Sequence, residues 1–253
     1  MSDPDFSVTL AVCSHRDIKI RAHATLWALK ECPNIKVNVI IQEGDALISR
    51  SRNKVATHFL KNTQDEMICF LDDDVEISAF DYTRMMYEVH TNRYPILGAP
   101  YALKNHEKSG FAIYPIEEKG TLEMGKSGKI MLVKRVSTGA MIIRREVFEK
   151  MICRKPVHGK LVCKDHAIHF CEDSGNYAFF QHREGMVDSK WKELSEDWFF
   201  CKNALDMGFQ VFLDTRPKLN HWGQFPYNFD FVALDGQYKK LDDVKLSYDL
   251  LKK

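Results

Sequence analysis

Residues 67–77 read Met-Ile-Cys-Phe-Leu-Asp-Asp-Asp-Val-Glu-Ile, so five apolar residues run directly into three carboxylates. An uninterrupted apolar run of this kind indicates a strand buried on both faces of a parallel sheet. In open α/β sheets, ligands bind just beyond the carboxyl ends of such strands. We therefore expect Asp72, Asp73 and Asp74 to lie at the lip of a cleft.

The three neighbouring carboxylates point to a cation site. Like charges this close repel one another, and a cation between them relieves the repulsion. Oxygen ligands suit Mg²⁺ or Mn²⁺. Because side chains alternate along an extended chain, Asp72 and Asp74 should share one side and Asp73 the other. The alternative is an acidic turn that simply ends the strand.

The composition is that of an ordinary globular protein. The 253 residues are 45% hydrophobic and 28% charged, and the net charge of +1 gives no electrostatic case for nucleic-acid binding. The 7 cysteines are odd in number and irregularly spaced, which favours reduced thiols over a disulfide framework. We find no signal-peptide pattern and no apolar stretch that could span a membrane. We therefore expect a soluble cytoplasmic protein, in the host cytoplasm if the source is viral.

Apolar runs and helical patterns alternate in the first part of the chain. Strands are expected over 7–13, 36–41 and 67–71, with one helix between each consecutive pair. Short connections join these elements, so their order predicts a layered α/β fold with right-handed crossovers. A helix over 81–90 and a strand over 96–103 are expected next.

The second part of the chain mixes short strands with helices. Leu241, Val244, Tyr248 and Leu251 fall at helical spacing, which predicts a closing helix. Before it we expect, in chain order, antiparallel strands over 111–116 and 129–136, a buried strand over 140–143, helices opening at Arg145 and after Ser195, and a strand over 210–213.

Residues 153–192 form the least regular stretch. Cysteine and histidine are zinc ligands, so a zinc site is one interpretation, but the stretch contains no Cys-x-x-Cys pair. A loop that acts as a lid beside a functional site is the preferred interpretation, because long loops in compact domains are often functional. The residues in question are Cys153, His158, Cys163, His166, His169, Cys171 and His182.

Two further stretches carry candidate side chains. In Ser195-Glu196-Asp197-Trp198, the serine is expected to cap a helix whose first turn holds both carboxylates. Helix starts favour carboxylates in any case, because of the helix dipole. In His221-Trp222-Gly223, the histidine lies just past a strand, and beside an acidic metal site it becomes a candidate ligand.

Three stretches taken in order resemble motifs of the GT-A superfamily of nucleotide-sugar glycosyltransferases, nearest in style to the family-2-like inverting enzymes. They are 70–75 for the DxD motif, 195–198 for the ED motif, and 221–223. Residues 136–148 are similar to the family's glycine-containing strand and following helix, and Arg52-Asn53 is also in the family's manner.

The resemblance spans residues 7–223 and implies an α/β fold. The expected sheet is Rossmann-like, mixed and mostly parallel, flanked by helices, with a smaller antiparallel ribbon on the acceptor side. We expect residues 1–253 to form one domain. Residues 1–103 would be its nucleotide-binding half, 104–223 its acceptor and catalytic half, and 224–253 its closing helix.

On the donor side, the resemblance implies that Asp72 contacts the ribose and uracil side of a nucleotide. Asp74 and His221 would hold a divalent metal that bridges the two phosphates. An imidazole ligand suits Mn²⁺ better than Mg²⁺. Asp73 fills the variable position of the motif, so which two carboxylates take the family roles stays open. The donor would be a UDP-sugar by default, with a GDP-sugar as alternative.

The remaining implied roles concern the nucleoside and the reaction. Asp197 would be the general base that activates a hydroxyl of a glycan or glycoconjugate acceptor, and Glu196 would orient the site or touch the sugar. Inversion of the sugar is expected, although retaining enzymes share the fold. The family places the nucleoside at positions matching Ser14, His15 and Asp45. Arg52 would face the nucleotide or the carboxylate cluster.

Other functions stay open at this point. A nucleotidyltransferase would usually need a glycine-rich phosphate loop after the first strand, and residues 13–17 contain no glycine. A metal-dependent phosphohydrolase or a non-catalytic nucleotide- or sugar-binding domain are the remaining alternatives. Tyr101, Trp191 and Trp198 could stack on sugar rings or pack in the core.

Overall fold

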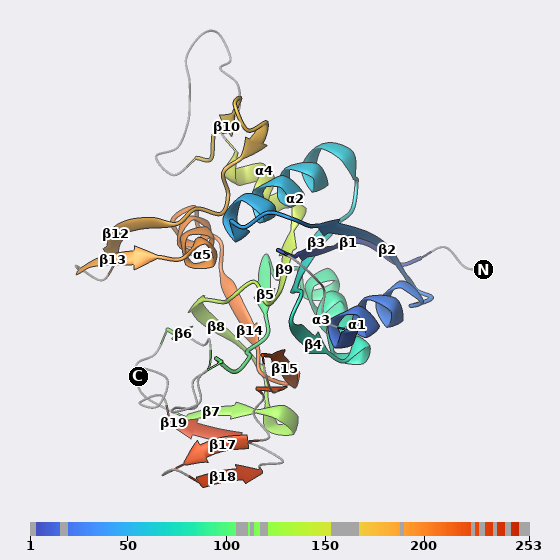
Figure 1. Ribbon diagram of the computed structural model, residues 1–253, viewed down its shortest axis with the longest axis vertical. Coiled ribbons are helices and arrows are strands. Elements are labelled where there is room, and N and C mark those ends of the chain that lie inside the picture. Colours follow the sequence, from blue (N-terminus) through green and yellow to red (C-terminus); the bar gives the residue numbers. More distant parts are fainter. Residues whose placement is uncertain are drawn as a thin grey trace.

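The computed structural model describes residues 4–15, 20–104, 111, 114–116, 121–152, 167–187, 190–223, 226–227, 231–234, 237–240 and 244–247. The described strands include an eight-stranded sheet in the order β2-β1-β3-β9-β5-β14-β8-β6 (Figure 1).

The elements of this main sheet and its helices have the following bounds. The strands are β1 (Phe6–Cys13), β2 (Ile35–Gln42), β3 (Met67–Asp72), β5 (Ile96–Gly98), β6 (Tyr114–Pro115), β8 (Ile130–Arg135), β9 (Ala140–Arg144) and β14 (Val211–Asp214). The helices are α1 (Ile20–Lys30), α2 (Ile48–Asn62), α3 (Ala79–Asn92), α4 (Arg145–Met151) and α5 (Glu196–Asp206), with the short 3₁₀ helix η1 (Gly125–Ser127).

Smaller antiparallel sheets lie outside the main sheet. Strand β15 (Leu219–Trp222) pairs with β4 (Val75–Ile77) and β16 (Pro226–Tyr227). The other pairs are β10 (Phe170–Cys171) with β11 (Asn176–Tyr177), β12 (Arg183–Val187) with β13 (Lys190–Leu194), β17 (Phe231–Leu234) with β18 (Gln237–Lys240), and β7 (Thr121–Met124) with β19 (Val244–Ser247).

Strand directions in the main sheet are mixed. Strand β1 is parallel to β2 and β3, β14 is parallel to β5, and β9 lies antiparallel between β3 and β5. Strand β8 is antiparallel to β14 and β6. All strands of the sheet except β9 and β8 therefore run in one direction. The prediction of a mixed, mostly parallel α/β sheet flanked by helices is confirmed.

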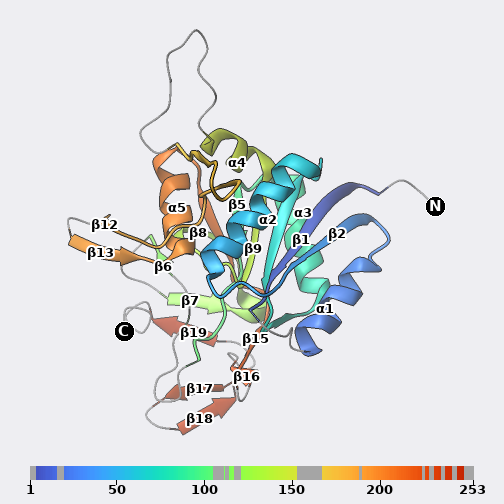
Figure 2. The same cartoon turned by 45° about the horizontal axis from the view of Figure 1, so that its top comes forward.

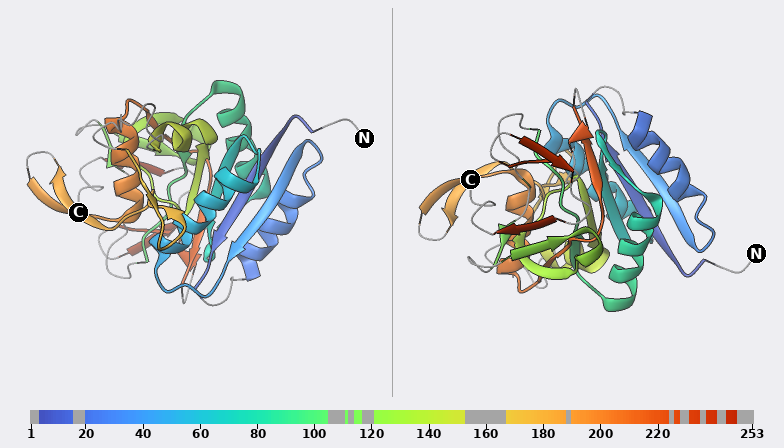
Figure 3. Two further views of the ribbon diagram at one scale, coloured as in Figure 1. Left: turned by 90° about the horizontal axis from the view of Figure 1, so that it is seen from above. Right: turned by 90° about the horizontal axis from the view of Figure 1, so that it is seen from below.

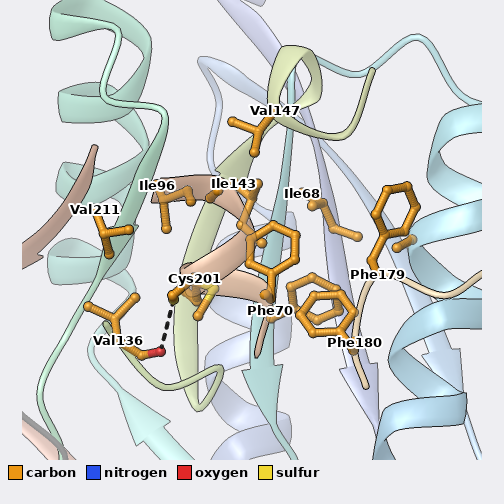
Figure 4. Packing of buried hydrophobic residues seen from close by; sticks show 14 of the residues in the cluster. Ile68, Phe70, Ile96, Val136, Ile143, Val147, Phe179, Phe180, Cys201 and Val211 are labelled. Atoms are coloured by element: carbon orange, nitrogen blue, oxygen red, sulfur yellow. Dashed lines mark hydrogen bonds between the residues drawn. The ribbon is translucent and has the colours of Figure 1, made fainter. Parts of the chain in front are cut away.

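Helices cover both faces of the sheet, with α1 and α3 on one face and α2, α4 and α5 on the other (Figure 3). Successive side chains of β3 point to opposite faces of the sheet and enter the two hydrophobic cores in turn. Ile68 and Phe70 pack on the side of α2, α4 and α5 (Figure 4). Met67, Cys69 and Leu71 pack on the side of α1 and α3. All five are at most 2% exposed, so the predicted strand buried on both faces is confirmed. Burial of each large apolar side chain contributes about 1.5–3 kcal/mol.

Strand β5 ends at Gly98, so it is shorter than the strand expected over 96–103. Pro100 lacks the backbone N–H that a central strand needs, and this limits the pairing. The strand expected over 111–116 is present only as β6, Tyr114–Pro115, which pairs antiparallel with β8 as predicted. Phe111 forms a bridge with Ala102 instead, and residues 112 and 113 lie outside the described residues. The other predicted strands and helices of the main sheet are confirmed with small shifts at their ends.

The predicted closing helix is wrong for the part of it that the structure describes. Val244–Ser247 is strand β19, with Val244 opposite Met124 and Leu246 opposite Leu122. The pairing satisfies backbone groups along β7, which a helix could not do. A short apolar run fits the periodicity of a helix as well as that of a strand. Here the run forms a strand because it pairs with the edge of β7. Leu241, Tyr248 and Leu251 lie outside the described residues.

The stretch predicted as an irregular loop contains two antiparallel ribbons, β10–β11 and β12–β13. The β12–β13 ribbon extends away from the main sheet (Figure 2). Among the described residues, no group of three or more His, Cys, Asp or Glu side chains forms a metal site. His182 contacts Glu193 instead (2.6 Å). Cys153, His158, Cys163 and His166 lie outside the described residues.

None of the helices in the described part of the chain is both long enough and apolar enough to cross a membrane.

The buried end of β3 gives a stability prediction. Replacement of Phe70 by alanine removes a ring that is 2% exposed and packs edge-on against Phe180, with ring centroids 5.4 Å apart. We expect Phe70→Ala to lower the free energy of unfolding by about 3–5 kcal/mol, measured by urea denaturation.

Phe80→Ala is the matched control, because the Phe80 ring is 75% exposed on α3. It should change the free energy of unfolding by about 0.5 kcal/mol or less. Equal losses in the two variants would contradict the assignment of β3 to the core.

Candidate active site

The carboxyl ends of β1, β2 and β3 meet at one edge of the sheet. The N–H of Gly44, after β2, donates to the carbonyl of Ser14, after β1 (3.1 Å). The hydroxyl of Ser14 donates to Oδ2 of Asp73, after β3 (2.6 Å). Burial raises the pKa of Asp73 above its usual value; the Ser14 bond opposes this, and the charges of Asp74 and Asp72 add to it.

Arg52 of α2 joins β3 to the start of α5. Its guanidinium donates to Oδ1 of Asp72 (2.7 Å) and to Oε1 of Glu196, and its side chain is only 4% exposed. Asp72 continues the alternation of Ile68 and Phe70, so it faces the side of the sheet that α2 and α5 cover. Burial works against the charged form of Arg52, but the two carboxylates raise its pKa above the usual value. Arg52 therefore contacts the carboxylate cluster rather than solvent.

Asp74 and His221 are brought together by the pairing of β4 with β15. The N–H of Trp222 donates to the carbonyl of Asp74 (2.7 Å), and His221 lies opposite Val75. The imidazole Nδ1 of His221 is 2.9 Å from the carbonyl of Ala102. A carbonyl can only accept, so the proton is on Nδ1 and donates to this oxygen. Nε2 then faces Asp74 Oδ1 at 3.5 Å.

The second carboxylate oxygen of Asp74 pairs with the ammonium of Lys104. Burial works to raise the pKa of Asp74, but contacts with His221 and Lys104 hold it below the usual value. The sequence carries no signal for Lys104, because its segment after β5 matches no motif.

The chemistry of these donors fits a divalent metal. A carboxylate oxygen and an imidazole nitrogen suit Mn²⁺. The Nδ1–H bond of His221 to a backbone carbonyl is the arrangement that orients histidine ligands in metal sites. Within the described residues, Asp74 and His221 form a pair and no larger cluster of His, Cys, Asp and Glu side chains. A metal held here would need most of its remaining ligands from phosphate or water.

Asp197 is fixed in the first turn of α5. Its Oδ1 accepts from the hydroxyl of Ser195 and from the N–H of Trp198 (2.7 Å). Ser195 holds the N-cap position, but its hydroxyl bonds the Asp197 carboxylate instead of a backbone N–H. No described residue donates to Oδ2 of Asp197, so one oxygen of a positioned carboxylate is left for another proton.

The carboxylate of Asp45 is occupied by hydrogen bonds from residues at the start of α2. Its carboxylate accepts from Arg50 (2.6 and 2.7 Å), from Lys54 (3.0 Å) and from the N–H of Leu47 (3.1 Å). The Arg50 bonds above all hold its pKa well below the usual value. Asp45 thus stabilises the start of α2. His15 is exposed next to Ser14.

The aromatic candidates have three different environments. Trp198 stacks on the guanidinium of Arg135, which also stacks on Tyr114, at 3.6 and 3.2 Å from the ring centroids. Burial lowers the pKa of Arg135. Tyr101 packs edge-on against His221, with ring centroids 4.8 Å apart, and Trp191 is 66% exposed. Sequence reasoning missed Arg135, because no residue near it in the chain predicts the stacking.

Comparison with known proteins supports the fold only. The sequence matches no family model and no curated relative. A197 from STIV is similar in structure, with TM-score 0.50 and 14% identity over 92% of this chain and 93% of that chain. GalNAc-T7, solved with UDP, GalNAc and Mn²⁺, has TM-score 0.51 and 11% identity over 85% of this chain and 43% of that chain. The fold is of the GT-A type. At these identities the likeness shows the fold.

The Arg52 contacts give a prediction for stability. Arg52→Met leaves the carboxylates of Asp72 and Glu196 without their shared cation in a partly buried site. Removal of one partner from a buried ion pair costs about 3–5 kcal/mol, and we expect a loss of that size in the free energy of unfolding.

Lys202→Met is the control. Lys202 pairs with Asp206 four residues later on α5, and both side chains are partly exposed (33% and 26%), so its replacement should matter much less. Urea denaturation of both variants measures the difference. A loss for Lys202→Met as large as that for Arg52→Met would contradict the role of Arg52.

Proposed function

We propose that this protein is a metal-dependent glycosyltransferase. It would move a sugar from a nucleoside diphosphate sugar to a hydroxyl of a glycan or glycoconjugate. A UDP-sugar is the first candidate donor, and a GDP-sugar is the alternative. The GT-A-type fold supports this proposal, and so does the likeness to GalNAc-T7, whose structure was solved with UDP, GalNAc and Mn²⁺.

The Arg52 bridge is the observation that carries the proposal. It ties Asp72, in the acidic motif after β3, to Glu196, the neighbour of Asp197 at the start of α5. These contacts hold the proposed donor-binding residues and the proposed base close to each other. A positioned carboxylate such as Asp197 is what a general base requires.

On the donor side, Asp74 and His221 would hold the metal, Mn²⁺ or Mg²⁺. When bound, the metal would neutralise the negative charge that develops on the leaving diphosphate. Asp72 and Asp73 would face the nucleoside, together with Ser14 and the exposed His15. Arg52 would hold Asp72 in place. Asp45 would hold the start of α2, the helix that carries Arg52.

On the acceptor side, Asp197 would be the general base. The hydroxyl of Ser195 and the N–H of Trp198 hold Oδ1, which leaves Oδ2 to accept the proton of the acceptor hydroxyl as that oxygen attacks the anomeric carbon. Glu196, bound to Arg52, would keep the first turn of α5 in position. A single displacement with one base would invert the anomeric configuration.

Two substitutions separate these roles. A panel of UDP- and GDP-sugars is screened for release of the nucleotide, and the active donor is then used with each variant. Asp197→Asn should slow turnover about 10²–10⁴-fold, because general-base catalysis contributes that much, and should change nucleotide affinity little. Asp74→Asn should weaken the Mn²⁺-dependent binding of UDP itself, measured by calorimetry.

Asp206→Asn serves as the control, since Asp206 lies at the far end of α5 and pairs with Lys202. It should change neither turnover nor affinity. Equal loss of nucleotide binding in Asp197→Asn and Asp74→Asn would refute this division of roles.

A further inference from the structure

The segment that follows β5 contacts both proposed metal ligands. The carbonyl of Ala102 accepts from Nδ1 of His221 (2.9 Å), and the ring of Tyr101 packs against the same imidazole. The ammonium of Lys104 pairs with Oδ2 of Asp74. One short piece of chain therefore orients one ligand and places a positive charge on the other.

The position of Lys104 is set by its neighbours in the chain. Tyr101 packs so closely over Gly139 that a Cβ added there would lie 2.4 Å from the tyrosine Cε1. Ala102 forms a β-bridge with Phe111 in addition to its bond to His221. The backbone is thus anchored two residues before Lys104.

The contact is shielded from water in part. The side chains of Lys104 and Asp74 are 33% and 24% exposed. Exposed ion pairs are usually weak, but this ammonium lies on a carboxylate that also faces an imidazole nitrogen at 3.5 Å. A divalent cation bound by Asp74 and His221 would lie beside the Lys104 charge, and the two positive charges would repel each other.

We propose that Lys104 is a phosphate-binding residue that keeps the metal site from loading before the nucleotide arrives. A diphosphate brings anionic oxygens that can pair with the ammonium and with the metal together. Asp74 is then released from Lys104 for the metal. Metal and nucleotide consequently bind with positive coupling, and the coupling is reciprocal. This inference rests on the function proposed above.

The test uses Lys104→Met, which keeps the length of the side chain and removes its charge. Binding of Mn²⁺ without nucleotide is measured from the electron paramagnetic resonance signal of free Mn²⁺, and binding of UDP without metal by calorimetry. Since coupling free energies typically correspond to 5–150-fold, we expect Lys104→Met to bind Mn²⁺ alone about 10-fold more tightly. It should bind UDP alone about 10-fold more weakly, because a charge-assisted contact is lost.

Two further variants control the experiment. Lys104→Arg retains the charge and should behave like the wild type in both titrations. Lys36→Met removes an exposed lysine near the start of β2, at the opposite end of the strand from the site, and should leave both constants unchanged.

The outcomes separate this inference from the proposed function. If the wild type binds UDP with Mn²⁺ but Lys104→Met has unchanged affinity for Mn²⁺ alone and for UDP alone, the role of Lys104 is overturned and the glycosyltransferase proposal stands. If the wild type binds none of UDP, GDP and CDP, with or without Mn²⁺, both proposals fail.

Discussion

The buried guanidinium of Arg52 is the interaction on which the candidate site depends. A cation so deeply buried is stable only where carboxylates face it, and here one comes from β3 and one from α5. Arg52 and Glu196 are 144 positions apart in the chain. The ion pairs therefore fix the start of α5, and with it Asp197, relative to the end of the central strand. Packing of α2, α4 and α5 over one core supplies the rigid frame for that contact.

The three consecutive aspartates are accommodated by three different partners. Asp72 pairs with Arg52, Asp73 accepts from Ser14, and Asp74 pairs with Lys104. From the sequence, we expected a metal to relieve their repulsion. In the structure, two side-chain cations and a hydroxyl already meet the three carboxylates. A metal at Asp74 would thus compete with Lys104 rather than fill an empty space, and this competition follows from the order of residues after β5.

Much of the fold could be predicted from the sequence, because β3 is apolar on both faces and its neighbours alternate strand with helix. The error in the closing helix could not be foreseen, since the apolar pattern around Val244 fits the periodicity of a helix and of a strand. The residue that pairs with Val244 is Met124 of β7, far earlier in the chain. The sequence predicted site residues after β3, at the start of α5 and at His221, and the structure links the first two through Arg52 and places Asp74 beside His221. The sequence could not identify Lys104 or Arg135, whose roles come from contacts across the fold. Nor could it indicate that Asp45 is occupied by Arg50 and Lys54.

We propose that the carboxyl edge of β1 and β3, together with β15, binds a nucleotide through a metal. Calorimetric titration of the wild-type protein with UDP, GDP and CDP, each with and without Mn²⁺, is the decisive measurement. We expect one of these nucleotides, UDP first, to bind markedly more tightly when Mn²⁺ is present. Absence of binding for all of them under both conditions would contradict the proposal.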